Sequence, residues 1–84
     1  MKITLKLFAS LAVHLPRAAR SRHRTDLDVE PGATVADVIL QQRIPPGQVA
    51  NVLVDGVWVA PPERAARVLA EGEVLAIWPP VAGG

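Results

Sequence analysis

Gly83 and Gly84 end the sequence and are the residues whose chemistry stands out. A C-terminal carboxyl group has a pKa of about 3.5. The terminal carboxyl group of Gly84 would therefore be ionised at neutral pH and able to act as a nucleophile. Its attack on the α-phosphate of an ATP molecule held by another protein would give an acyl-adenylate. That mixed anhydride is open to a sulfur or nitrogen nucleophile. The pair therefore predicts Gly84 as the reacting residue. Gly83 would accompany it into a narrow channel of the partner, since neither residue has a Cβ that would fill that channel.

The residues before this pair would set the path of the tail. Pro79 and Pro80 lack an N–H and have a fixed φ, so a strand cannot simply continue through them and they would set the direction of the tail. Val81 and Ala82 would line the channel that the tail enters. We therefore expect residues 79–84 to form an exposed tail, against the alternative of an ordinary frayed chain end.

The rest of the chain carries no set of residues that predicts a catalytic or metal site. There is no cysteine, which excludes thiolate metal ligands and a cysteine nucleophile. His14 and His23 have no spaced third ligand, and Ser10 and Ser21 have no His–Asp partners. No phosphate-binding glycine loop is present. We expect no metal and no bound cofactor, no catalytic site of the chain's own, and ATP bound only by an activating partner.

Charge is low overall but uneven. The net charge is +1, so nucleic acid is not an expected partner. Residues 17–24 nevertheless carry four arginines and one histidine without an acid. This segment is interpreted as a solvated loop. A docking patch for an acidic partner and an RNA contact, as in a small RNA-binding module, remain alternatives.

Alternating and helical patterns predict the elements that must position the tail. Residues 2–8 and 26–30 alternate as strands, and 74–78 form an apolar last strand. Thr34 predicts a helix start, with Asp37 three residues later as a capping partner, and the helix should end before residue 45. Short additional segments are expected at residues 9–15, a helical turn or two, and at 63–70, a turn with Leu69 pointing inward.

A tight hairpin is predicted at residues 51–59, because an Asp-Gly pair separates two β-branched runs. Trp58 alternates with its neighbours Val57 and Val59 and should face opposite to them. Two interpretations are open: Trp58 packs over the hairpin, or it stands partly exposed as a docking residue for a partner.

Three β segments flanking one helix favour an α+β fold, a mixed sheet of about five strands packed on one main helix. The first and last strands are the most apolar, which suits central, parallel positions. This arrangement is the β-grasp, or ubiquitin-like, fold. The 84 residues make one domain, 1–84, with 79–84 as its tail. The longest apolar runs fall short of the roughly 18 residues that span a bilayer, and residues 1–4 lack a signal-peptide pattern. We therefore expect a cytoplasmic protein that does not associate with membranes.

The ending resembles a known family. Residues 77–84 are similar to the aromatic-Pro-Pro-Val-x-Gly-Gly ending of molybdopterin synthase small subunits, with Trp78 where phenylalanine is more frequent. Residues 3–11 resemble that family's first strand and helix start. Residues 69–74 and 54–56 resemble its Leu-x-Asp-Gly-Asp-Glu turn and Val-Asn-Gly hairpin.

The resemblance implies a sulfur carrier of the MoaD/ThiS group. A ubiquitin-activating-like adenylyltransferase would adenylate Gly84, and a sulfur donor system would convert it to a thiocarboxylate. The tail would then enter the larger molybdopterin synthase subunit, so the chain would be the small subunit of a sulfurtransferase complex. Carriage of sulfur for thiamin or another pathway, and attachment to lysines as a protein modifier, are the alternatives that the same ending implies.

Overall fold

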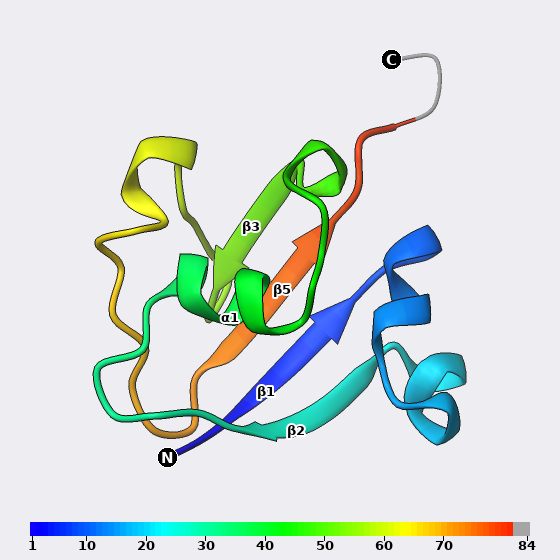
Figure 1. Ribbon diagram of the computed structural model, residues 1–84, viewed down its shortest axis with the longest axis horizontal. Helices are drawn as coiled ribbons and strands as arrows, with labels where there is room; N and C mark the ends of the chain where they lie inside the picture. The colour runs from blue at the N-terminus through cyan, green and yellow to red at the C-terminus, as the bar shows by residue number, and fades with distance from the viewer. Residues whose placement is uncertain (82–84) are drawn as a thin grey trace.

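A computed structural model describes residues 1–81 and shows a five-stranded mixed sheet with one α-helix against it (Figure 1). The strands are arranged in the order β2-β1-β5-β3-β4. Their bounds are β1 Lys2–Leu7, β2 Arg24–Asp28, β3 Asn51–Val54, β4 Val57–Trp58 and β5 Val74–Trp78. The α-helix is α1, Val35–Gln41, and four 3₁₀ helices are η1 Ala9–His14, η2 Arg17–Arg22, η3 Pro46–Gln48 and η4 Pro61–Glu63. The predicted β-grasp architecture is confirmed.

The two most apolar strands occupy the middle of the sheet, as predicted. β1 and β5 pair in parallel, with Leu5 opposite Leu75 and Leu7 opposite Ile77. β2 pairs with the outer edge of β1 and β3 with the outer edge of β5, both antiparallel. The strand that leads to the tail is therefore hydrogen-bonded along both of its edges.

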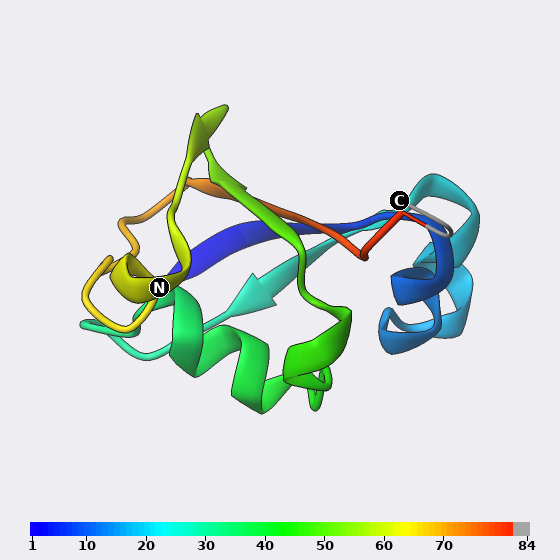
Figure 2. The same ribbon diagram turned by 90° about the horizontal axis from the view of Figure 1, so that it is seen from above.

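A capping box begins α1 and fixes its orientation. The Asp37 N–H donates to Thr34 Oγ1 at 3.1 Å, and the Thr34 N–H donates to Asp37 Oδ2 at 2.9 Å. This reciprocal pair satisfies backbone donors that a helix start leaves open. Val35 and Val38 follow helical spacing and are both fully buried. Figure 2 shows that α1 lies on one side of the sheet.

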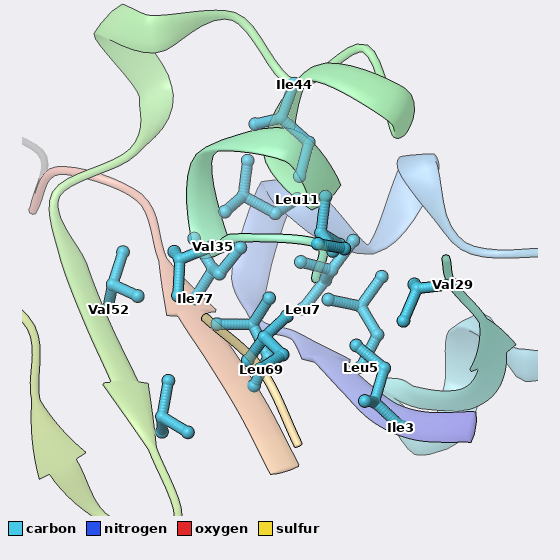
Figure 3. Packing of buried hydrophobic residues seen from close by; sticks show 14 of the residues in the cluster. Ile3, Leu5, Leu7, Leu11, Val29, Val35, Ile44, Val52, Leu69 and Ile77 are labelled. Atoms are coloured by element: carbon cyan, nitrogen blue, oxygen red, sulfur yellow. The ribbon is translucent and has the colours of Figure 1, made fainter. Parts of the chain in front are cut away.

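One apolar core joins the helix to the inner face of the sheet (Figure 3). Ile3, Leu5 and Leu7 alternate inward from β1 and are at most 1% exposed. The largest buried side chains also include Leu11, Leu15, Val52, Val54, Leu75 and Ile77. Leu69 is 2% exposed, which confirms its prediction as an inward anchor. No buried polar or charged residue was found in the described part of the chain.

The hairpin between β3 and β4 turns at Asp55 and Gly56, as predicted. Both residues have positive φ, 49° and 80°, the pattern of a type I′ turn. β4 is only two residues long, so the ribbon is shorter than the predicted span 51–59.

Two predicted boundaries differ from the structure. The second strand runs from Arg24 to Asp28 and not over residues 26–30, because Lys6 of β1 pairs with Arg24. The basic segment 17–24 is not an irregular loop: most of it forms η2, and Ala19 within it is 2% exposed. Within residues 1–81, the helices are all too short or too polar to cross a membrane.

Candidate functional site

The end of β5, Ile77 and Trp78, is the point from which the tail leaves, and we call it the tail root. It is hydrogen-bonded on both sides. Phe8 lies directly after β1, and its N–H donates to the Ile77 carbonyl at 3.2 Å. On the other side, the Ala50 N–H, directly before β3, donates to the Trp78 carbonyl at 2.9 Å. The backbone of β5 is therefore tied to its neighbours up to its last residue. These bonds fix the point at which the tail leaves the sheet.

A stack of three rings covers this root. Trp78 and Phe8 lie with ring centroids 4.4 Å apart and planes 10° from parallel. The His23 ring also stacks with Phe8, with centroids 6.0 Å apart and planes 15° from parallel. The His23 Nδ1 is 3.1 Å from the Leu7 carbonyl oxygen, which can only accept, so Nδ1 carries the proton that is donated. Close aromatic contacts add stability beyond the area they bury, so the stack stiffens the end of β5.

The chain becomes progressively more exposed to solvent over the first residues after β5. Pro79 is half-buried, Pro80 is exposed and Val81 is 78% exposed. The predicted channel residue Ala82 and the predicted reacting pair, Gly83 and Gly84, lie outside the described residues. The expected exit of an exposed tail from a rigid strand is thus seen as far as Val81.

The open face of the sheet carries apolar side chains next to this root. The side chains at alternate positions Leu53 and Ala76 point away from the core strip of Val52, Val54 and Ile77. Trp58 pairs with Leu53 across the hairpin and is 57% exposed. The interpretation of Trp58 as a packed residue is therefore wrong; Trp58 is exposed, and its role in docking a partner stays a prediction.

Val57 follows the predicted alternation around Trp58, because it pairs with the buried Val54 whereas Trp58 pairs with Leu53 on the open face. Its exposure nevertheless differs from that of Val59: Val57 is 68% exposed and Val59 is 4% exposed. β4 is only two residues long and forms the edge of the sheet, so Val57 lies largely in solvent although it is on the core side. The hairpin therefore presents two large apolar side chains to solvent.

The family model matches the ThiS family over residues 13–84. The chain belongs to the ThiS family. The match runs through the whole tail, so the ending is part of the family pattern. The predicted resemblance to the MoaD/ThiS group of ubiquitin-like sulfur carriers is thereby confirmed. A search of curated proteins found no significant match.

Solved structures of ubiquitin-like proteins are similar over the whole of this ThiS-family chain. The solution structure of Haloferax volcanii HVO 2177 has 29% identity and a TM-score of 0.74, covering 100% of this chain and 87% of the other. SAMP1 of Haloferax volcanii, a small archaeal modifier protein, has 26% identity and a TM-score of 0.68 with full coverage of both chains. The complex of subunits 1 and 2 of molybdopterin-converting factor from Helicobacter pylori matches at 13% identity and a TM-score of 0.61, again with full coverage. At that identity the last match shows the fold alone.

An ion pair stabilises the turn before β5 in this ThiS-family chain. The Glu73 carboxylate contacts the Arg67 guanidinium at 2.7 Å and accepts from the Ala70 N–H at 2.6 Å. The hydrogen bond from Arg67 lowers the pKa of Glu73, and the same bond raises the pKa of Arg67. In the described range, no three His, Asp or Glu side chains lie close enough to hold a metal ion. The pair is structural and lies at the opposite end of β5 from the tail root.

Two arginines of the basic segment 17–24 donate hydrogen bonds to nearby backbone carbonyls while staying exposed. Arg20 donates to the Leu15 and Val13 carbonyls at 3.2 and 3.0 Å, and Arg22 donates to the Ala18 carbonyl at 3.2 Å. The bonds of Arg20 lie at the end of η1, where carbonyls otherwise lack partners. His23, for which the sequence offered no metal-ligand partners, is half-buried in the ring stack. The sequence did not predict the stack because its members are far apart in the chain. Aromatic residues at the ends of two predicted strands were the signal that could have indicated it.

Proposed function

We propose that this ThiS-family protein carries sulfur on the C-terminal carboxylate of Gly84 and donates it in molybdopterin biosynthesis. The observation that supports this is the tail root. β5 is hydrogen-bonded up to Ile77 on one edge and up to Trp78 on the other, and the chain then continues to the exposed residues Pro80 and Val81. A partner would meet a slim, reactive tip at a fixed position on a rigid body.

The chemistry would take place on partner proteins. A carboxylate oxygen of Gly84 attacks the α-phosphorus of ATP bound to a ubiquitin-activating-like adenylyltransferase, and pyrophosphate leaves. Sulfide-level sulfur from a donor system then bonds to the carbonyl carbon, and AMP leaves with the electrons of the broken C–O bond. The product is a thiocarboxylate. Only the end of the tail would enter the partner, so larger side chains at residues 82–84 would slow the reaction.

The larger molybdopterin synthase subunit would then receive the tail. Val81 and Ala82 would line its channel, with Pro79 and Pro80 directing them. Trp58 and the open face of the sheet would dock the partner, because an exposed tryptophan loses the most water-accessible apolar area on binding. Residues 1–84 would act in the cytoplasm as the small, sulfur-carrying subunit, without a cofactor of their own.

The decisive experiment is mass spectrometry of the intact chain and its C-terminal peptide. The chain is incubated with ATP, a candidate adenylyltransferase and a sulfur donor, and fragmentation locates any exchange of oxygen for sulfur on Gly84. Removal of Gly83 and Gly84 should abolish the exchange without changing the fold. Gly84→Ala should slow it through added bulk at the reacting carbon. Thiolation of the truncated chain would refute the proposal.

A protein-modifier role is the second candidate. It is favoured by the likeness to SAMP1, which is 26% identical over the full length of both chains. In that role the adenylate would react with a lysine amine in place of sulfur and form an isopeptide bond. Isopeptide-linked Gly84 on lysines in cell extracts would support it. A thiocarboxylate that transfers sulfur to a pterin precursor only with the larger synthase subunit present would support the first assignment.

A further inference from the structure

A hollow of about 390 Å³ lies beside α1, away from the ring stack. Its walls are mainly apolar and come from α1, from the residues around η3 and from the segment after η4. Ile39, Leu40, Pro46 and Val49 supply apolar surface, and Arg43 and Arg64 supply the charge. The volume lies within the range of ligand-binding clefts, about 300–1,000 Å³. Leu40 at the rim is 77% exposed, so the apolar surface continues outward from the hollow.

Arg64 lies in the wall with incomplete hydrogen bonding. Its backbone is held by the Ala36 N–H, which donates to the Arg64 carbonyl at 3.0 Å, and its Nη2 donates to the Ala50 carbonyl at 3.1 Å. Its Nε is buried and has no hydrogen-bond partner among residues 1–81. Burial lowers the pKa of Arg64. A buried donor without an acceptor costs free energy, and an anion that reaches the guanidinium would recover part of it.

Arg43 adds a second positive charge at the rim. It follows α1 with a φ of 57°, a conformation in which glycine or asparagine is usual at the end of a helix. Its side chain is exposed, and no ion pair to it is found within the described residues. The lining contains no acidic residue. The hollow is thus apolar and positively charged, which is complementary to an aliphatic group flanked by carboxylates.

We propose that this hollow binds a short acidic segment of a partner protein. A leucine or isoleucine side chain would enter between Ile39, Leu40 and Val49, and neighbouring carboxylates would pair with Arg43 and Arg64. A small inorganic anion would leave the apolar walls unused, and a purely aliphatic ligand would leave the guanidinium groups unpaired. This binding goes beyond the proposed function and does not depend on the chemistry of the tail.

The hollow is connected to the tail root through Ala50. The Ala50 carbonyl accepts from Arg64, and its N–H donates to the Trp78 carbonyl at the end of β5. One residue therefore links the wall of the hollow to the strand that carries the tail. A partner that holds the tail would have the hollow within reach as a second, independent point of contact.

The test is an NMR titration of the complete ¹⁵N-labelled chain. The probe is an acetylated and amidated hexapeptide of alternating leucine and aspartate. Its binding should shift the backbone amides of residues 39–44 and 64. A matched peptide with lysine in place of aspartate should shift none of them, because its charges repel Arg43 and Arg64. The titration extends to about 5 mM peptide, enough to occupy most of a site with a Kd of about 1 mM.

Two charge reversals complete the test. Arg43→Glu should raise the Kd for the aspartate peptide by about tenfold or more, since it replaces an attraction with a repulsion. Arg17→Glu changes the net charge equally at an exposed arginine on η2, and it should change the Kd by less than about twofold. A well-dispersed spectrum of each variant shows that it is folded.

Three results would overturn the proposal. The first is an absence of shifts at residues 39–44 across the titration. The second is equal binding of the lysine peptide, or equal weakening by both charge reversals. The third is tighter binding of a free-carboxylate peptide with the sequence of residues 79–84, which would make the tail of a second copy the occupant.

Discussion

Phe8 and Trp78 should be energetically coupled, and a double-mutant cycle can measure their coupling energy. The variants are Phe8→Leu, Trp78→Leu and the double variant, which keep apolar side chains but remove the ring stack. The rings lie 4.4 Å apart and within 10° of parallel, so the stack should contribute about 0.5–1.5 kcal/mol beyond buried area. Both side chains are half-buried, so each single change should cost about 1–2 kcal/mol in total.

Urea unfolding followed by circular dichroism gives the free energies. For a domain of this size, each kcal/mol should lower the Tm by about 4–8 °C. Trp58→Leu is the matched control, because Trp58 is 57% exposed and its replacement should change stability by less than about 0.5 kcal/mol. Hydrogen exchange at the Ala50 amide, which is bonded to the Trp78 carbonyl, should become faster in Trp78→Leu and stay unchanged in Trp58→Leu.

A coupling energy below about 0.3 kcal/mol would refute this reasoning, since contacts that do not interact are additive within that margin. The ring stack would then be only a geometric neighbour of the tail root. Unchanged exchange at Ala50 in Trp78→Leu would separately show that the backbone bonds hold the root without help from the rings.

Three further substitutions, and Gly47→Ala as a control, test the turns and the helix start. Thr34→Ala removes the Oγ1 that caps α1 and should cost about 1 kcal/mol in urea unfolding. Gly56→Ala should cost about 1–2 kcal/mol because the φ of Gly56 is +80°, whereas Gly47→Ala, without a positive φ, should be nearly neutral; an added Cβ meets no atom within 4 Å at either position. The pKa of Glu73 is lowered by Arg67, so its stabilisation is present above the ordinary carboxyl pKa and disappears as pH falls through the lowered value. The stability difference between wild type and Glu73→Gln, below about 1 kcal/mol for a partly exposed pair, should therefore vanish in acid, and a difference that grows on acidification would contradict this.

The sheet was predictable where side-chain direction and turn chemistry agree. In β1, alternation of apolar and polar residues specified which side is buried, and in β5 an unbroken apolar run predicted a central place in the sheet. The pair Asp55 and Gly56 predicted the hairpin because few residues tolerate two consecutive positive φ angles. Thr34 predicted the helix start because its hydroxyl can satisfy backbone donors.

The ends of β2 were not predictable from the same pattern. Arg24, Asp26 and Asp28 all point to the outer face, so alternation continues equally well when the strand is shifted by two residues. Pairing of Arg24 with Lys6 decides the boundary, and pairing depends on how η1 and η2 return the chain. The path of this connection depends on tertiary packing, including the burial of Ala19. A local sequence pattern carries no information about that packing.

The candidate site divides in the same way. The tail was predicted from residue types alone, because glycine and proline restrict the backbone wherever they occur. The exposure of Trp58 depends on how far β4 extends, which the predicted hairpin alone does not specify. The hollow depends on Arg64 contacting α1, and these two segments are distant in the sequence.

The hydrogen bonds to the last two residues of β5, one on each edge of the strand, have a consequence for binding. If the strand end frayed, a partner would have to order Ile77 and Trp78 as well as the tail, at a cost of about 1–2 kcal/mol per residue fixed. The bonds from Phe8 and Ala50 remove that cost before the partner arrives. The next two residues, Pro79 and Pro80, each have a φ fixed by the proline ring, which lowers the cost of ordering them as well. The tail root therefore favours binding of the tip by limiting what the partner has to immobilise.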